Sequence, residues 1–324
     1  MFNENEIFRI NERFIKDYRV SIDKGIAYTE YFKERLEQYN KYSSNIIDKY
    51  NKTVDEICNY FEDIESYYVY RNALADKLIT LLCDNEDKYG FSGNDGTKKI
   101  KRDYKTNQHN IPNNGCCKDT LLKESMISID LKSANFTALK YFNPKIVEDC
   151  SCYDEFITKH SYLKHIVESK YFRQRIFGKA RVSQQVIIEK YLTGKILEEL
   201  LTIIPKEDII SFNNDEIILY ENKNLKDVIA AVENVSKILD INTHIEKFTL
   251  YKISGIKDAY LKKGINITND NEEILKIYGV SPILFPFVLS ELYNEDIKDS
   301  YKYFRNTEKC LSKMIEIPNI KIEY

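Results

Sequence analysis

Tryptophan is absent from this chain of 324 residues, and glycine (10) and proline (6) are scarce. No apolar run approaches the roughly 18 residues that a membrane-spanning helix needs, so we expect no membrane partner. The N-terminus, MFNENEIFRINERF, lacks the apolar stretch of a signal peptide, and we expect none. A Gly-rich phosphate loop, a Gly-x-Ser-x-Gly elbow and a His-Glu-x-x-His motif are also missing, which argues against the enzymes that use them.

The cysteines number seven, an odd count, and no secretion signal accompanies them. We therefore expect reduced thiols and an intracellular location, in the cytoplasm or nucleus. Cys116-Cys117 and Cys150-Ser151-Cys152, with His109 nearby, supply the ligand types of a zinc site, but their spacing departs from paired zinc knuckles. Buried or idle thiols are the expectation. The abundance of Tyr, Asn, Lys and Ile suggests an AT-rich genome, which low-GC bacteria, protists, phages and large DNA viruses share, so the chain could be encoded by a virus or phage.

Positive charge is concentrated in the middle of a chain whose net charge is −3. Residues 98–181 hold 17 Lys and Arg against 9 Asp and Glu, a balance of +8, so the remainder carries −11. A basic middle segment is compatible with a groove for nucleic acid, and chance clustering in a Lys-rich chain is the alternative. The candidate contacts to a phosphate backbone are Lys98, Lys99, Lys101, Arg102 and Lys105. The alternative interpretation of this segment is a basic loop exposed to solvent.

The pattern of apolar residues divides the chain into four regions. We predict a helical region (1–85), a basic loop-rich connector (86–125), an α+β domain (126–264) with a helical insertion at 150–204, and a mixed C-terminal region (265–324). Within the first region, Thr53-Val54-Asp55-Glu56 fits a capping box, which predicts that one helix ends near Asn51 and another begins at Thr53.

The order of elements in the α+β domain is typical of a ferredoxin-like antiparallel sheet flanked by helices. The fold class that we predict is therefore α+β. The expected elements are a strand at 126–131, a helix at 133–142, further helices within 151–204, a hairpin at 209–220, a helix at 225–239, and strands at 248–253 and 259–263.

Acidic residues stand at two points where this sheet would present them. Asp130 ends the first strand, and Asp215 and Glu216 lie at the tip of the hairpin SFNNDEIILYE (211–221). If the two strands are neighbours, Asp130 and Asp215 can share a cation, and oxygen ligands suit Mg²⁺ or Mn²⁺. Strand alternation predicts that Glu216 points to the opposite face, which makes it the weaker ligand candidate.

Three stretches between Met126 and Glu221 resemble motifs of family A DNA polymerases. SIDLKSANFTALKYF is similar to the first motif of the palm domain, with Asn135 where the family has an acid. FNNDEIILYE resembles the third motif, with Asn214 where a His is usual. YFRQRIFGKAR resembles the fingers helix, because Phe177-Gly178 matches its aromatic residue and glycine. In that helix Arg173 takes the place of a Lys and Arg181 that of a Tyr.

The resemblance implies a palm-like domain, preceded by a thumb-like helical region, that performs metal-dependent nucleotidyl transfer on nucleic acid and nucleoside triphosphates. Asp130 and Asp215 would hold Mg²⁺ or Mn²⁺, and Glu216 would complete the catalytic acids. Helical spacing predicts that Arg173, Phe177 and Arg181 share one face. In that arrangement Arg173, Lys179 and Arg181 would clamp the triphosphate, and Phe177 would stack on the nucleotide. The alternative is a non-catalytic protein with a degenerate palm, such as a replication accessory or virion component.

Overall fold

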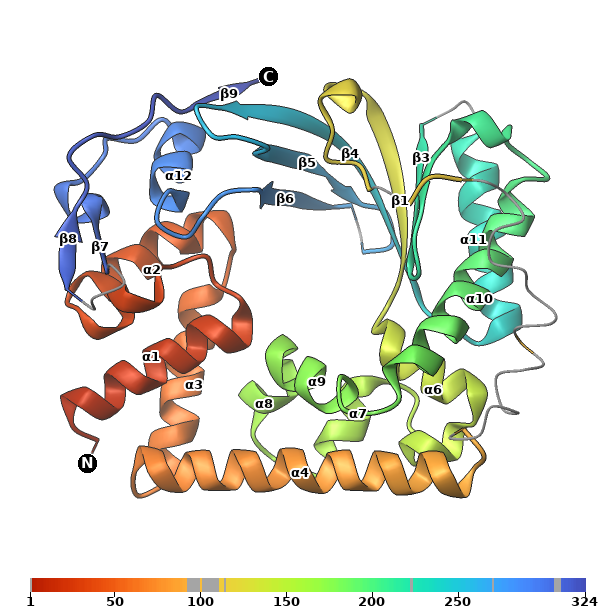
Figure 1. Ribbon diagram of the computed structural model, residues 1–324, viewed down its shortest axis with the longest axis horizontal. Coiled ribbons are helices and arrows are strands. Elements are labelled where there is room, and N and C mark those ends of the chain that lie inside the picture. The colour runs from red at the N-terminus through yellow and green to blue at the C-terminus, as the bar shows by residue number, and fades with distance from the viewer. Residues whose placement is uncertain are drawn as a thin grey trace.

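A computed structural model of the protein describes residues 2–91, 100, 111–113, 115–221, 224–269, 271–305 and 310–324 (Figure 1). It is an α+β structure in which helices flank an antiparallel sheet, so the predicted fold class is confirmed. Within these ranges, no helix is both long enough and apolar enough to cross a membrane.

The N-terminal region is helical, as predicted. Its helices are α1 (Glu4–Tyr18), α2 (Tyr31–Tyr42), α3 (Ile46–Tyr60) and α4 (Ile64–Lys88). The predicted boundary at Thr53 is wrong, because its side chain is buried and donates to the carbonyl of Lys49 within a continuous α3. The real capping box lies ten residues later, where Asp63 accepts from the amide of Ser66 at the start of α4.

The connector is followed by several helices, of which α9 (Lys170–Phe177) packs against α4, the helix that runs along the bottom of Figure 1. They are α6 (Ala134–Phe142), α7 (Tyr153–Thr158), α8 (Lys164–Glu168), α9 (Lys170–Phe177) and α10 (Val182–Leu200). Two further helices, α11 (Leu225–Leu239) and α12 (Phe285–Tyr293), come later in the chain. The bounds of α6 and α11 agree with the predicted helices to within one residue, because both have a clear apolar period and a clear end.

The main sheet has the strand order β2-β3-β1-β4-β5-β6, and β9 pairs with β4 beside it. Its strands are β1 (Ser125–Leu131), β2 (Ile209–Phe212), β3 (Glu216–Tyr220), β4 (Thr243–Ser254), β5 (Tyr260–Asn266), β6 (Glu272–Tyr278) and β9 (Lys321–Glu323). The pairing of β1 with β3 confirms the prediction that the first strand lies beside the hairpin. The first four strands, with α10 and α11 between them, have the predicted ferredoxin-like order.

Alternation along the strands divides the sheet into two faces. Ile127 and Ile129 of β1 face a large core that also takes in α6, α10, α11 and the apolar side of α4. Met126 of β1 and Phe248 of β4 lie on the opposite face, where Leu121 of the connector packs on them. Polar residues of β1 that share this second face, Ser128 and Asp130, are therefore directed away from α6, α10 and α11.

The C-terminal region adds elements that we predicted only in part. Strand β6 was not predicted, because its sequence EEILKIY shows no strict alternation. Helix α12 begins at Phe285, with Pro286 in its first turn. A small separate sheet pairs β7 (Tyr303–Arg305) with β8 (Leu311–Lys313).

Candidate functional site

Asp130 lies next to the tip of the β2–β3 hairpin. The register pairs Asp130 of β1 with Glu216 of β3, and the amide of Leu131 donates to the carbonyl of Asp215 at 2.9 Å. This pattern makes Asp130 and Glu216 a non-hydrogen-bonded pair, the type in which facing side chains come closest. Both side chains therefore lie on the same face of the sheet.

The position of Glu216 corrects our expectation that it would point away from Asp130. Asp215 belongs to the turn rather than to the strand, so alternation between Asp215 and Glu216 does not apply. The carboxylate of Glu216 accepts a hydrogen bond from the Ser128 hydroxyl at 2.6 Å. The structure thus places Glu216 opposite Asp130, with Asp215 in the adjoining turn close enough for its charge to act on Asp130.

The charges in this cluster act on Asp130. Burial and the negative charges of Asp215, Glu216 and Glu246, in that order, raise the pKa of the Asp130 carboxyl to about 7, while Lys276 opposes the shift. Asp215 is the strongest of the charged neighbours. Such a surplus of carboxylate is unfavourable unless a proton or a cation compensates it.

A fourth acid, Glu189 of α10, approaches Asp215 from the helical side. Glu189 is 4% exposed and accepts a hydrogen bond from the Asn135 side chain at 2.9 Å. Burial and the charge of Asp215 raise its pKa to about 7. Sequence analysis missed Glu189, whose partner Asn135 stands at the position where the motif that this segment resembles has an acid.

Glu246 of β4 lies on the same sheet face and was also missed. It makes ion pairs with Lys262 and Lys276, both at 2.6 Å, and a hydrogen bond with His244 at 2.9 Å. Despite its burial, these two lysines hold the pKa of Glu246 at about 2. This face of the sheet therefore carries two kinds of acidic site. The acids of β1, β3 and the β2–β3 turn form a cluster, called the uncompensated cluster below, whereas lysines neutralise Glu246 on β4.

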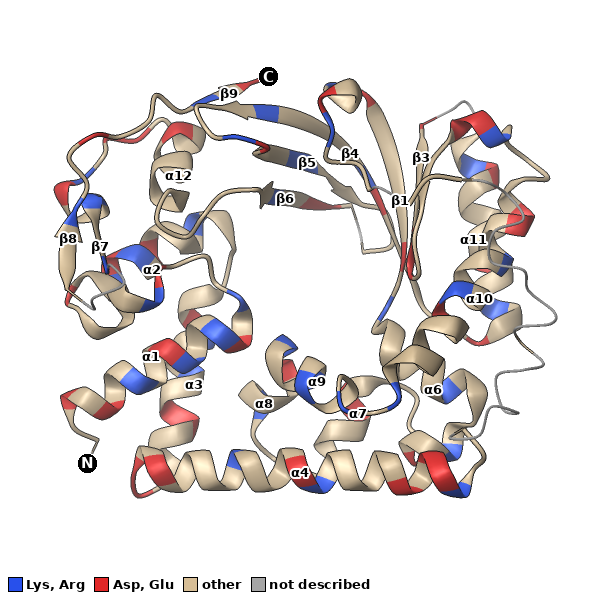
Figure 2. Ribbon diagram, viewed as in Figure 1, with Lys and Arg blue, Asp and Glu red and all other residues tan. Residues whose placement is uncertain are grey.

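Cations on α9 face the uncompensated cluster. Figure 2 shows basic positions on α9 and α1 and acidic positions where β1, β3 and β4 meet. Arg173 donates to the hydroxyl of Ser133, three residues after Asp130, at 3.3 Å. Partial desolvation and the cations Arg19, Arg173 and Lys276 lower the pKa of Lys170, while Asp130 acts in the opposite direction.

Other members of the expected triphosphate clamp lie elsewhere. Helix α9 ends at Phe177, so Arg181 does not continue its face and instead precedes α10, where it pairs with Asp87 of α4 at 2.8 Å. Phe177 is 1% exposed and packs against the rings of Phe136 and Tyr153, so it offers no surface for a nucleotide. Lys179 is exposed in the turn after α9. Of the three predicted clamp cations, Arg173 alone has a contact that places it near Asp130.

A hollow of about 770 Å³ lies between β5 and β6 and the loop that joins α2 to α3. Its lining includes Lys276, which also pairs with Glu246. The charged residues that line it are Lys41, Lys49, Lys263, Lys276, Glu272 and Glu273. The predicted backbone contacts Lys98, Lys99, Lys101, Arg102 and Lys105 lie outside the described residues, as does His109.

The cysteines of the described ranges are all free. In that part of the chain, no group of three or more His, Cys, Asp and Glu side chains is arranged to hold a metal ion. A metal at the acidic cluster would therefore be held by two carboxylates, with water completing the coordination, as Mg²⁺ accepts in other proteins.

The raised pKa values predict that the stability of the protein decreases as the pH rises. Folding raises the pKa of Asp130 from 3.8 and of Glu189 from 4.5 to about 7, so their protonated forms favour the folded state. That contribution is complete below about pH 4 and is lost as the pH rises through 7. When a chelator keeps metal ions away, we expect the melting temperature of Asp130→Asn to lie about 2–4 °C above that of the wild type at pH 8 and close to it at pH 5.

Thermal unfolding between pH 5 and 8 measures this difference. Glu207→Gln, a change at an exposed carboxylate just before β2, is the control and should follow the wild type throughout. Parallel curves for Asp130→Asn and the wild type would show that Asp130 is not the group that titrates.

Neither protein-family models nor curated proteins give a match to this chain.

Proposed function

We propose that the protein is a metal-dependent nucleotidyltransferase that acts on nucleic acid and nucleoside triphosphates. One observation carries the proposal: Asp130 near the end of β1 faces Glu216 of β3 and lies next to the β2–β3 turn that holds Asp215, whose charge acts on it. Two-metal phosphoryl transfer requires carboxylates that separate strands bring to one point.

The donor set at this point fits a hard divalent cation. The ligands would be carboxylate oxygens of Asp130 and Asp215, and the mutual repulsion that raises the pKa of Asp130 is what a cation relieves. When bound, Mg²⁺ or Mn²⁺ would supply Lewis-acid stabilisation of the negative charge that develops in phosphoryl transfer.

The other residues around the acids have roles that follow from their charge. Lys170 and Arg173 on α9 would attract the triphosphate, since both cations lie near Asp130. Ser128 fixes the carboxylate of Glu216 beside Asp130. The hollow lined by Lys41, Lys49 and Lys276 would admit a nucleic-acid strand next to the acids.

Extension of labelled DNA and RNA primers by the purified protein, with Mg²⁺ and with Mn²⁺, tests the proposal. Each primer should be annealed to a template and also supplied alone, because the site does not distinguish templated from untemplated transfer. Incorporation that depends on the metal is the expected result. A wild type that is inert on all of these substrates would contradict the proposal.

Some observations favour the alternative, a non-catalytic protein with a degenerate palm. The ring expected to stack on a nucleotide, Phe177, is buried, and Arg181 is engaged by α4. A protein of this kind would bind nucleic acid or a protein partner without incorporating nucleotides. Metal-independent binding together with an inert wild type would therefore support it.

The basic connector yields a prediction that applies to both functions. If Lys98, Lys99, Lys101 and Arg102 contact phosphates, binding to primed or single-stranded nucleic acid should weaken steeply with salt. Each contact adds roughly −0.7 to −0.9 to the slope of log affinity against log salt. Replacing the four residues by Ala should make the slope shallower by about 3. Fluorescence anisotropy across a salt series measures it.

A matched control replaces four exposed lysines elsewhere, Lys206, Lys226, Lys237 and Lys257, by Ala. The slope of log affinity against log salt for this control should differ from the wild-type slope by less than about 0.9, the contribution of one phosphate contact. Equal losses in both variants would show that net charge, and not the connector, sets the affinity.

A further inference from the structure

A second hollow, of about 560 Å³, lies between the C-terminal half of α1, the loop that follows it and α9. It shares no lining residue with the hollow at β5 and β6. The apolar part of its lining, Ile15, Val20 and Ile22, is 4–5% exposed and belongs to the core of the N-terminal helices. The charged residues of the lining are Arg13, Lys16, Arg19, Lys24 and Asp23. We call this site the basic hollow.

Positive charge is still in surplus when the ion-pair partners of the lining residues are counted. Lys16 pairs with Glu12. Arg13 lies 3.1 Å from Asp17, and Asp17 also pairs with Arg71 at 2.7 Å. Adding these partners to the lining gives five cations against three carboxylates. The basic hollow therefore attracts anions.

Two of the lining cations, Arg19 and Lys24, are exposed. Within the described ranges neither of them forms an ion pair with a carboxylate, and Arg19 donates to the neutral side chain of Gln174. Their charges are therefore available to a ligand.

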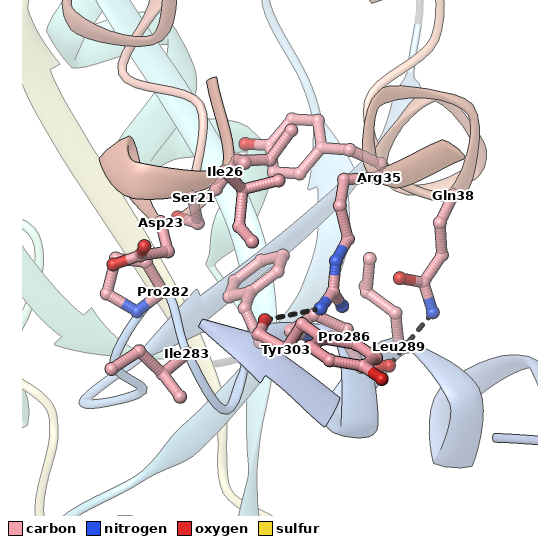
Figure 3. A pocket seen from close by; sticks show the side chains of 13 residues that line it. Ser21, Asp23, Ile26, Arg35, Gln38, Pro282, Ile283, Pro286, Leu289 and Tyr303 are labelled. Carbon is pink, nitrogen blue, oxygen red and sulfur yellow. Dashed lines mark hydrogen bonds between the residues drawn. The ribbon is translucent and has the colours of Figure 1, made fainter. Parts of the chain in front are cut away.

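Asp23, the acid of the lining, is already engaged. Its carboxylate accepts from the amides of Gly25 and Arg305 at 3.0 and 3.4 Å. Asp23 and Pro282 also line the neighbouring pocket that Figure 3 shows, which contains the buried cation Arg35. The charge of Asp23 is thus shared between Arg35 and the basic hollow.

An aromatic ring lies in the same hollow as these cations. Tyr171 of α9 is 42% exposed, and the guanidinium carbon of Arg13 lies 4.6 Å from the centre of its ring. The ring thus offers an apolar surface beside positive charge. Grooves that bind single-stranded nucleic acids combine the same two features, because cations contact the phosphates and aromatic rings contact the bases.

The positive charge continues from the basic hollow toward the uncompensated cluster. Arg19 acts on Lys170, the first residue of α9, as do Arg173 and Asp130. The cations therefore follow a path along the end of α1 and along α9 that leads to Asp130. A strand carries a negative charge at every phosphate, so it can occupy such a path, whereas a small anion occupies one point of it.

We propose that the basic hollow binds a single-stranded nucleic acid, with Lys16, Arg19 and Lys24 in contact with its phosphates and Tyr171 against a base. A volume of about 560 Å³ is typical of a pocket for one small molecule, so the hollow admits a single strand and excludes a duplex. The choice of nucleic acid as the ligand rests on the proposed function, but binding here requires neither a metal nor nucleotidyl transfer.

Fluorescence anisotropy with labelled single strands of DNA and RNA, in a chelator and across a salt series, tests the site. The triple variant Lys16→Gln, Arg19→Gln and Lys24→Gln should bind more weakly than the wild type. Its slope of log affinity against log salt should be shallower by about 2, because each contact with a single strand contributes roughly 0.7. A slope equal to that of the wild type would overturn the proposal.

The matched control is the triple variant Lys33→Gln, Lys77→Gln and Lys145→Gln, which removes the same charge from exposed positions on other elements. Its slope should stay close to that of the wild type. An equal loss in both triple variants would show that net charge, and not the basic hollow, sets the affinity, and would overturn the proposal.

Photocrosslinking locates the strand on the wild-type protein and needs no substitution. A single strand that carries iodouracil should form a crosslink to Tyr171 on irradiation, which peptide mapping by mass spectrometry identifies. Crosslinks confined to other parts of the chain would overturn the proposal. Binding of a labelled nucleoside triphosphate, but of no strand, that is lost in the Lys16, Arg19 and Lys24 variant would also overturn it, because the hollow would then be a nucleotide site.

These binding measurements separate this site from the proposed function. A wild type that binds a strand at the basic hollow but extends no primer would contradict the proposed function and support the site. A wild type that extends primers, together with a Lys16, Arg19 and Lys24 variant that binds strands as the wild type does, would overturn the site alone.

Discussion

Replacing Asp215 by Asn should abolish nucleotide incorporation with either metal while leaving the protein folded. The change keeps the size and hydrogen-bonding capacity of the side chain but removes one of the two charges that would hold the cation. Electrostatic stabilisation by a metal supplies several kcal/mol, so we expect a loss of about three decades in rate or more.

The melting temperature separates this effect from unfolding. Asp215 raises the pKa of both Asp130 and Glu189, so removing its charge relieves repulsion on two sides. Asp215→Asn should therefore melt at or above the wild-type temperature at pH 8. An inactive variant that is also less stable would point to a structural role for the β2–β3 turn instead.

Glu216→Gln gives the internal comparison. Glu216 faces Asp130, but the Ser128 hydroxyl already engages its carboxylate, and Gln can keep that hydrogen bond. We expect a loss of about tenfold. Glu207→Gln, at an exposed acid just before the same hairpin, should retain wild-type activity. Full activity in Asp215→Asn would remove Asp215 from the catalytic assignment.

The fold was predictable where a local pattern determined it. The helix at Leu225–Leu239 and the hairpin around Asn213 follow from apolar period and from turn residues alone. The false boundary at Thr53 shows the limit of such reasoning. A sequence that fits a capping box was overridden because Thr53 is buried against the core and can bond to its own helix.

The proximity of the acids could be predicted from the sequence, whereas the arrangement of the cations could not. Asp130 lies near a strand end and Asp215 at a hairpin tip, and the order of elements makes the strand and the hairpin neighbours. Glu189 and Glu246 could not be identified, because their roles depend on partners that the fold brings from other elements. The clamp failed for a related reason: α9 stops at Phe177, and a helical wheel drawn through Gly178 assumed that it continued.

A buried ion pair joins the N-terminal helices to α9, and it carries the largest stability effect that we predict. Asp17 of α1 and Arg71 of α4 are each 2% exposed and lie 2.7 Å apart. The same carboxylate oxygen accepts from Ser169, the residue that caps α9, at 2.8 Å. It also lies 3.1 Å from Arg13. This single carboxylate therefore fixes the start of α9, next to Lys170.

Asp17→Ala should lower the free energy of unfolding by about 3–5 kcal/mol, because it leaves Arg71 buried without its counter-ion. Denaturation in urea measures the loss. Asp76→Ala, which removes an exposed partner of Arg175, is the matched control and should stay within about 0.5 kcal/mol of the wild type.

The double variant Asp17→Leu with Arg71→Met identifies the cause. If the cost of Asp17→Ala comes from an unpaired buried cation, removing the cation as well should recover part of the stability, so the double variant should be more stable than Asp17→Ala. The lost hydrogen bond to Ser169 should keep it about 1 kcal/mol below the wild type. If the double variant is less stable than Asp17→Ala, packing around Arg71, whose guanidinium lies 5.0 Å from the centre of the Phe172 ring, rather than its charge, holds α1 and α4 to α9.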